Sequence, residues 1–196
     1  AHKFANLGLA AALGQPGPLE VGGLPFTTKD ELAADQEAHP PYGTNLTYPL
    51  GDYTRMHQTS GTRGAPLRWL DTPDSWNSLL GCWEKIFQHL GVARSDRLFF
   101  PFSFGPFLGF WTAFEAAARL GCLCLPAGGL STLARLRLLL DHRPTIMLCT
   151  PTYALHLAEM AREHQLPIQG ILRALIVAGE PGGGIPATRR RIESAW

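Results

Sequence analysis

A short polar loop is the stretch of this sequence whose residue types could do chemistry. Residues 58–66 run Gln-Thr-Ser-Gly-Thr-Arg-Gly-Ala-Pro and contain no large apolar side chain. Glycines let backbone N–H groups turn toward one point, and nearby hydroxyls add further donors around it. This combination favours an anion such as phosphate. Residues 55–57 and 67–70 have the composition of strands, so we expect the loop to connect two strands.

The loop matches neither of the two common nucleotide-binding patterns. A Walker loop ends in Gly-Lys-Ser/Thr and opens a helix, and a dinucleotide fingerprint places three glycines between a strand and a helix. A turn rich in Ser, Thr and Gly is also typical of an ordinary hairpin. From the residues alone, an anion-binding loop and a purely structural hairpin both remain open.

Composition limits the class of protein. The 196 residues, 45% of them hydrophobic, suffice for one domain with a sizeable core. A net charge of +1 gives no basic field, so we expect neither nucleic acid nor an anionic membrane as the main partner. Residues 1–13 are helix-like and lack the features of a signal peptide, which indicates a cytoplasmic protein. Arg189, Arg190 and Arg191 are predicted to lie on the solvated face of a C-terminal helix.

The four cysteines give no sign of a metal site. They lie in apolar stretches at Cys82, Cys122, Cys124 and Cys149. No Cys-x-x-Cys pair or histidine at ligand spacing accompanies them, so we expect buried, reduced thiols.

Capping signals predict two helices ahead of and behind the loop. Thr28 with Glu31 three residues later is a capping box, so a short helix should start there. Thr72 is a suitable N-cap before Pro73, and apolar residues then recur at steps of three and four, which indicates an amphipathic helix ended by Gly91. The apolar residues of this stripe are Trp76, Leu79, Leu80, Trp83, Phe87 and Leu90. Residues 35–54, rich in Pro, Gly and Tyr, are predicted to form an extended surface segment.

The second half of the chain predicts an α/β fold. Short unbroken apolar runs indicate strands buried on both faces. They lie near 98–101, 122–125, 145–149 and 173–178. Helix-like segments lie between them at about 107–120, 131–141 and 151–165, with Ser131 and Thr150 as caps. Such crossovers build a mostly parallel sheet with helices on its faces, and ligands bind beyond the carboxyl ends of its strands.

The loop also resembles a known one. Thr59-Ser60-Gly61-Thr62-x-Gly64-x-Pro66 is similar to the phosphate-binding loop of the adenylate-forming, or AMP-binding, enzymes. Four further segments narrow the resemblance to the phenylacetate–coenzyme A ligase family. They are Leu-Pro-Phe-Thr-Thr-Lys-Asp-Glu-Leu at 24–32, the aromatic and glycine-rich stretch 102–109, Thr-Pro-Thr-Tyr from 150, and Gly-Glu-Pro from 179. The five segments occur in the family's order, which argues against a chance match.

The resemblance implies roles for individual residues. The ATP phosphates would be bound by Thr59, Ser60, Gly61, Thr62, Arg63 and Gly64. The adenine would be approached by Gly179, Glu180 and Pro181. The acyl pocket would be lined by Phe102, Phe104, Gly105, Phe107 and Tyr153. No metal ligand is assigned, and the family's catalytic lysine would lie beyond Trp196.

The resemblance also implies a two-step reaction. The carboxylate of an aryl or arylacetic acid attacks the α-phosphate of ATP–Mg²⁺ and releases pyrophosphate, and the thiol of coenzyme A then captures the acyl-adenylate. A homodimer is the family's habit. On this interpretation the chain is an N-terminal adenylation-domain portion with a helical and extended segment (1–54), a phosphate-loop hairpin (55–72) and an α/β subdomain (73–196).

Two departures from the family's pattern keep alternatives open. Ala65 stands where lysine is usual and Arg63 where threonine is usual, and we expect Arg63 to replace part of the missing phosphate contact. The family's ribose-binding aspartate, hinge and catalytic lysine have no counterpart before Trp196, so we expect a fragment that makes no acyl-CoA by itself. The alternatives are a non-catalytic module that binds nucleotide or aryl acid, an adenylating enzyme with another acyl acceptor, and an unrelated α/β domain.

Overall fold

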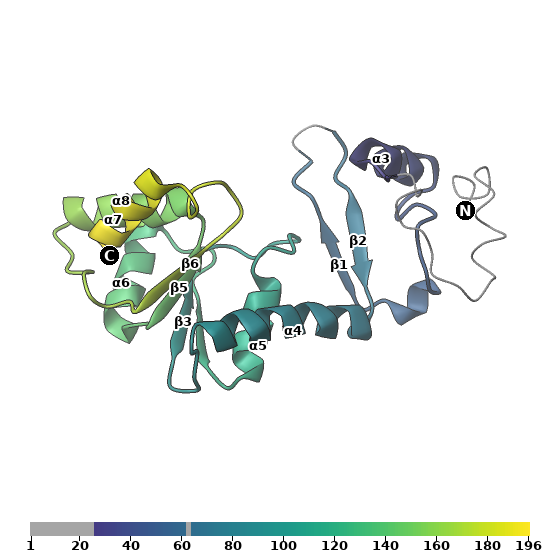
Figure 1. The fold of residues 1–196 in the computed structure, drawn as a ribbon. Helices are drawn as coiled ribbons and strands as arrows, with labels where there is room; N and C mark the ends of the chain where they lie inside the picture. Colours follow the sequence, from purple (N-terminus) through teal and green to yellow (C-terminus); the bar gives the residue numbers. More distant parts are fainter. Residues whose placement is uncertain (1–25, 62–63) are drawn as a thin grey trace. The chain divides into compact units, whose positions relative to one another are not determined.

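The structure is a computed structural model that describes residues 26–61 and 64–196 (Figure 1). The chain divides into two compact units, residues 1–44 and 45–196. The predicted helix at 1–13, the start of the 24–32 segment, and Thr62 and Arg63 lie outside the described residues.

The first unit contains helix α3 (Lys29–Ala38), which begins at the predicted capping box. The Thr28 hydroxyl accepts from the Glu31 N–H, and the Glu31 carboxylate accepts from the Thr28 N–H at 2.8 Å. Asp35 then accepts hydrogen bonds from the backbone N–H and the hydroxyl of Thr44, both at 2.7 Å. The prediction of an extended segment from residue 35 was therefore wrong at its start, because the helix continues to Ala38.

In the second unit, a short 3₁₀ turn, η2 (Leu50–Asp52), precedes an antiparallel hairpin of β1 (Arg55–Gln58) and β2 (Arg68–Asp71). Arg55 pairs with Asp71 and Gln58 with Arg68. The prediction that the polar loop connects two strands is confirmed.

A four-stranded parallel sheet follows, in the order β4-β3-β5-β6. Its strands are β3 (Arg97–Phe100), β4 (Leu123–Pro126), β5 (Ile146–Cys149) and β6 (Ala174–Val177). Five helices accompany it: α4 (Pro73–His89), α5 (Trp111–Arg119), α6 (Thr132–His142), α7 (Pro151–Glu163) and α8 (Pro186–Ala195). The predicted α/β class, with a parallel sheet and helices on its faces, is confirmed.

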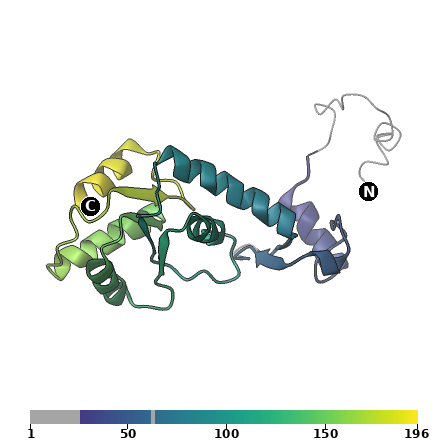
Figure 2. The ribbon, with the colours of Figure 1, turned by 90° about the horizontal axis from the view of Figure 1, so that it is seen from below.

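Helices lie on both faces of the sheet (Figure 1 and Figure 2). The alternation of side chains along the strands separates two cores, one on each face. Leu98 and Phe100 pack with α4 and α5, whereas Phe99 between them packs with α6, α7 and α8. This follows from the two-residue period of a strand. On α4, the predicted stripe is confirmed by the burial of Trp76, Leu80 and Phe87.

Helix starts follow the predicted caps. The hydroxyls of Thr72, Ser131 and Thr150 each accept from the backbone N–H three residues later, at the starts of α4, α6 and α7. The helix predicted from residue 107 instead begins at Trp111. The reason is local, because Gly105 and Gly109 have φ values of 54° and 34° and the chain forms a loop there.

Burial of the strands differs from the prediction at the edges. All four residues of β5 are buried, whereas β6 is half-buried throughout and Leu123 of β4 is 54% exposed. Among the described residues β4 and β6 are the edge strands, so only one side of each has a neighbouring strand. The expectation of strands buried on both faces therefore holds for the central strands alone.

Two further properties concern the described helices. The side chains of Arg189, Arg190 and Arg191 are exposed on α8, as predicted. None of the described helices is both long and apolar enough to cross a membrane.

The cysteines are free thiols, but they are not all buried as predicted. Cys122 and Cys149 are buried and Cys124 is half-buried, whereas Cys82 is exposed. Cys82 lies on α4 outside the apolar stripe, so an apolar neighbourhood in sequence did not imply burial. Burial raises the pKa of Cys149 to about 12 and that of Cys124 to about 11, which keeps both protonated at neutral pH.

Because the four thiols differ in exposure, we expect them to react with a thiol reagent at different rates. In the native protein, Cys82 is expected to react rapidly with Ellman's reagent, and the other three thiols only after unfolding, because the thiolate is the nucleophile. A Cys82→Ser variant should lack the rapid phase. Comparable rates for several thiols in the folded wild type would contradict this expectation.

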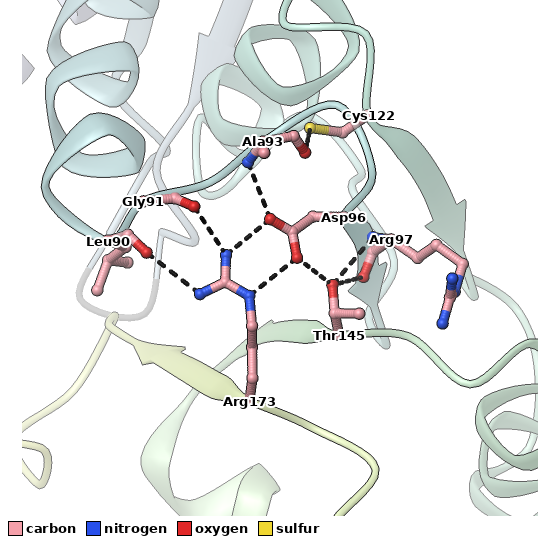
Figure 3. Close-up of polar contacts among 8 residues, drawn as sticks. All are labelled: Leu90, Gly91, Ala93, Asp96, Arg97, Cys122, Thr145 and Arg173. Atoms are coloured by element: carbon pink, nitrogen blue, oxygen red, sulfur yellow. Dashed lines mark hydrogen bonds and ion pairs between the residues drawn. The ribbon is translucent and has the colours of Figure 1, made fainter.

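A polar cluster joins the amino ends of three neighbouring strands (Figure 3). Asp96 precedes β3, Thr145 precedes β5 and Arg173 precedes β6. One Asp96 carboxylate oxygen accepts from the Thr145 hydroxyl at 2.6 Å and from Arg173 Nε at 2.9 Å. The other accepts from Arg173 Nη2 at 2.7 Å and from the Ala93 N–H at 2.9 Å.

The guanidinium of Arg173 extends this cluster to the end of α4. It donates to the carbonyl oxygens of Leu90 and Gly91, both at 3.2 Å. Its hydrogen bonds to Asp96 hold the pKa of that carboxyl well below its usual range, although burial of the carboxylate acts in the opposite direction. The cluster therefore connects three strands and a helix at the amino ends of the strands, away from their carboxyl ends.

Candidate functional site

A pocket of about 380 Å³ lies at the carboxyl ends of β3, β5 and β6. This is the place where parallel α/β sheets bind ligands. It is lined by Pro101, Phe102, Ser103, Phe104, Phe107, Gly109, Phe110, Arg135, Cys149, Thr150, Tyr153, Ala178 and Gly179. The lining combines side chains from segments as far apart as residues 101 and 179.

Aromatic rings form one wall of the pocket. Phe102 and Phe104 follow β3, and their ring centroids lie 5.1 Å apart. Phe104 packs on Trp111 at 4.4 Å and Phe102 on Phe110 at 5.0 Å, so both rings rest on the start of α5. The three ring pairs are tilted, with interplanar angles of 54°, 37° and 46°, and an aromatic wall of this kind favours an apolar, flat ligand.

Other residues of the lining carry polar groups. Tyr153 lies in the first turn of α7, whose N-cap is Thr150. The Tyr153 hydroxyl accepts a hydrogen bond of 2.6 Å from Nη1 of Arg135, which lies on α6. The Cys149 thiol at the end of β5 is protonated because its pKa is raised to about 12 by burial, so it belongs to the neutral lining.

The turn after β6 closes the pocket. Gly179, with φ of 92°, lines it. The Glu180 carboxylate instead accepts hydrogen bonds from the N–H of Thr152, at 2.7 Å, and from its hydroxyl. These hydrogen bonds lower the pKa of Glu180. Glu180 thus fixes the turn to the start of α7, and neither it nor Pro181 lines the pocket.

The polar loop is closed at its base by its own residues. The Thr59 N–H donates to the Leu67 carbonyl at 2.9 Å, and the Thr59 hydroxyl accepts from the Leu67 N–H at 3.0 Å. The Gly64 N–H donates to the Gly61 carbonyl at 3.0 Å. Ser60 is exposed, and Gly61 has φ of 68°. The side chain of Thr59 therefore holds the hairpin, while Ser60 is open to solvent.

One hydrogen bond connects the hairpin with the aromatic segment. The Gln58 N–H, at the end of β1, donates to the Pro106 carbonyl at 2.8 Å. The polar loop begins at the next residue, and Pro106 lies between the pocket residues Phe104 and Phe107. The described loop residues do not line the pocket itself.

The structure thus brings together part of the predicted site. Phe102, Phe104, Phe107, Tyr153 and Gly179 line one pocket, whereas Gly105 does not. Sequence reasoning missed Arg135, Thr150 as a lining residue, and Cys149. No sequence signal pointed to Arg135, because an arginine among leucines on a helix is typical of a solvated face. The described residues contain no group of three or more His, Cys, Asp or Glu side chains that could hold a metal ion.

Comparisons with known proteins agree with this geometry. The fold is that of adenylate-forming ligases. A 2-hydroxyisobutyryl-CoA ligase in its postadenylation state superposes with a TM-score of 0.85 at 28% identity, over 99% of this chain and 41% of that one. A second structure of such a ligase, in complex with 2-HIB-AMP and CoA, gives a TM-score of 0.82 at 31% identity, over 88% of this chain and 37% of the other. No protein-family model matches the chain.

Sequence similarity identifies the relatives within that class. The chain is 32% identical to a phenylacetate–coenzyme A ligase of Pseudomonas putida over 158 residues, 80% of this chain and 35% of the relative. It is 30% identical to a phenylacetate–coenzyme A ligase of Aromatoleum evansii over 161 residues, again 80% of this chain and 35% of the relative. The chain is therefore related to the phenylacetate–coenzyme A ligases and spans about a third of their length, corresponding to their N-terminal portion.

Proposed function

We propose that this chain forms the nucleotide- and acid-binding part of an AMP-forming acid–coenzyme A ligase that activates an aryl or arylacetic acid such as phenylacetate. The observation that carries the proposal is the aromatic pocket at the strand carboxyl ends. Its volume lies in the range of small-molecule sites, and its lining is mainly apolar with a few polar groups. Relatives named as phenylacetate–coenzyme A ligases support an aromatic acid.

The proposed reaction divides the site between two substrates. Phe102, Phe104, Phe107 and Tyr153 would hold the acid, and the turn at 179–181 would approach the adenine. The loop residues Thr59, Ser60, Gly61 and Gly64, with Thr62 and Arg63 outside the described residues, would bind the ATP phosphates. Mg²⁺ would then be held largely by those phosphates, as is usual for this ion.

Catalysis in this reaction depends on position and charge. The acid carboxylate attacks the α-phosphate of ATP and pyrophosphate leaves. The thiol of coenzyme A, losing its proton, then attacks the carbonyl carbon of the acyl-adenylate, and AMP leaves. This chain would contribute by orienting the acid and excluding water from its ring, which are effects of binding geometry. Coenzyme A as the acceptor is supported by the similar 2-hydroxyisobutyryl-CoA ligase, whose structure contains an acyl-adenylate and CoA. A homodimer is proposed from the family resemblance.

A stable mimic of the acyl-adenylate tests the proposal. We expect the chain to bind 5′-O-[N-(phenylacetyl)sulfamoyl]adenosine more tightly than ATP or phenylacetate alone, because the mimic spans both parts of the site. Phe107 lines the pocket and is 44% exposed, so Phe107→Ala should weaken binding roughly tenfold with little loss of stability. Calorimetric titration measures both.

Leu130→Ala is the matched control. Leu130 is 41% exposed and does not line the pocket, so its truncation should leave the dissociation constant unchanged. Failure of the wild-type chain to bind the mimic would contradict the proposal. Equal effects of the two substitutions would place the acid elsewhere.

A further inference from the structure

Arg135 is a charged side chain in the lining of a mainly apolar pocket. It is half-buried on α6. Its Nε donates to the Ala127 carbonyl at 2.9 Å, and its Nη1 donates to the Tyr153 hydroxyl at 2.6 Å. Within the described ranges, Nη2 has no hydrogen-bond acceptor on the protein, and the ion pairs include no carboxylate partner for Arg135.

This arrangement leaves a donor and a positive charge for a ligand. Taking a guanidinium partly out of water is costly unless acceptors replace the water. Two of its nitrogens are satisfied by fixed protein oxygens, which also fix the plane of the group. A bound molecule with an oxygen acceptor would satisfy the remaining nitrogen, and a planar guanidinium suits such oxygens.

The sheet order places Arg135 on one side of the site. Its partner Ala127 follows β4, whereas Gly179 follows β6, and β4 and β6 are opposite edges of the four-stranded sheet. If the nucleotide lies by the turn after β6, the reacting carboxylate lies on that side. Arg135 then meets the end of the acid that is remote from the reacting carboxylate.

We propose that Arg135 is a specificity-determining residue that selects acids with a second oxygen acceptor, such as a ring hydroxyl, remote from the carboxylate that is activated. This inference rests on the proposed function, since it uses the same pocket. It predicts that hydroxy-substituted arylacetic acids are better ligands than the unsubstituted or methyl-substituted acids.

Four acyl-sulfamoyl adenosines test the inference because their reacting carboxyl is already joined to the nucleotide part. They carry phenylacetyl, 4-methylphenylacetyl and hydroxyphenylacetyl groups, the last as both the 3- and the 4-isomer. We expect the wild-type chain to bind one hydroxy isomer about 10- to 100-fold more tightly than the methyl compound. Arg135→Met should abolish this preference while changing the affinity for the phenylacetyl compound by less than about threefold.

Control variants separate recognition of the ligand's hydroxy group by Arg135 from effects of the substitution on the folded structure. Arg137→Met changes an exposed arginine of the same helix and should behave as the wild type. Tyr153→Phe removes the acceptor of Nη1 but leaves the charge, so the preference for the hydroxy compound should persist. This variant keeps the inference testable if Arg135→Met does not fold, as judged by circular dichroism.

The outcomes distinguish the two proposals. Three results would overturn the role of Arg135 and leave the proposed function standing. They are a wild type that shows no preference for the hydroxy compounds, a preference that is lost in Tyr153→Phe, and an Arg135→Met variant whose affinity falls equally for all compounds. Absence of binding for every compound would overturn the proposed function, and the role of Arg135 with it.

Discussion

Replacement of Asp96 by alanine is expected to lower the free energy of unfolding by about 3 kcal/mol. The Asp96 side chain is 6% exposed, and its carboxylate accepts four hydrogen bonds from Ala93, Thr145 and Arg173. Its removal leaves the Ala93 N–H without its acceptor, leaves the Thr145 hydroxyl donating only the longer hydrogen bond of 3.4 Å to the Arg97 carbonyl, and takes the counter-ion from Arg173. The loss should stay at the lower end of the range for buried pairs, because the Arg173 side chain is 41% exposed and can be solvated. Urea unfolding followed by circular dichroism measures the change.

Glu159→Ala provides the control. Glu159 pairs with Arg162 at 3.8 Å on the surface of α7, with both side chains more than half exposed. Such pairs contribute between about 0 and 1 kcal/mol, so this variant should unfold almost as the wild type does. Similar unfolding free energies for the two variants would contradict the stabilising role of the Asp96 cluster.

The same cluster gives stability a defined pH dependence. The pKa of Asp96 is lowered in the folded protein by its hydrogen bonds with Arg173, whereas in the unfolded chain it should be about 3.9. Stability from this group is therefore complete above about pH 4–5 and is lost as the pH falls through the folded pKa. We expect the stability difference between the wild type and Asp96→Asn to shrink below about pH 4. A difference that is constant with pH would rule out this linkage.

The regular elements could be predicted from sequence because their signals are local. Apolar runs predicted the positions of all four parallel strands to within one or two residues, and hydroxyl residues before Pro73 and Pro151 predicted two helix starts. Those signals depend on neighbouring residues only. The exposure of β4 and β6 could not be predicted in the same way, because it depends on where a strand lies in the sheet.

The polar clusters could not be predicted because their members are distant in sequence. Asp96 and Arg173 are separated by 77 residues and meet only because β3, β5 and β6 are adjacent and parallel. Arg135 and Tyr153 lie on successive helices, and either residue alone has an ordinary sequence context. Family resemblance indicated Phe102, Phe104, Phe107, Tyr153 and Gly179 among the thirteen lining residues, but it gave no reason to include a residue outside the matching segments.

Gly179 offers the sharpest test of the pocket. Replacement by valine is expected to weaken binding of the phenylacetyl-sulfamoyl adenosine roughly 100-fold or more, which corresponds to about 2.7 kcal/mol. Gly179 has φ of 92°, a conformation that a β-branched residue rarely adopts. A Cβ atom there would lie 3.4 Å from Cγ2 of Thr150, and the valine methyl groups would take up space in the pocket that both residues line. Calorimetric titration of the folded variant gives the dissociation constant.

Backbone strain alone must be separated from the filling of the pocket. Gly170→Val shares the strain, because Gly170 has φ of 71°, but a Cβ atom there has no other atom within 4 Å, and Gly170 does not line the pocket. Both variants should lose stability, since a strained residue costs about 1–3 kcal/mol. Only Gly179→Val should lose affinity for the mimic. If both variants bind it as the wild type does, the turn after β6 does not contact the ligand. If both lose affinity alike, strain accounts for the loss.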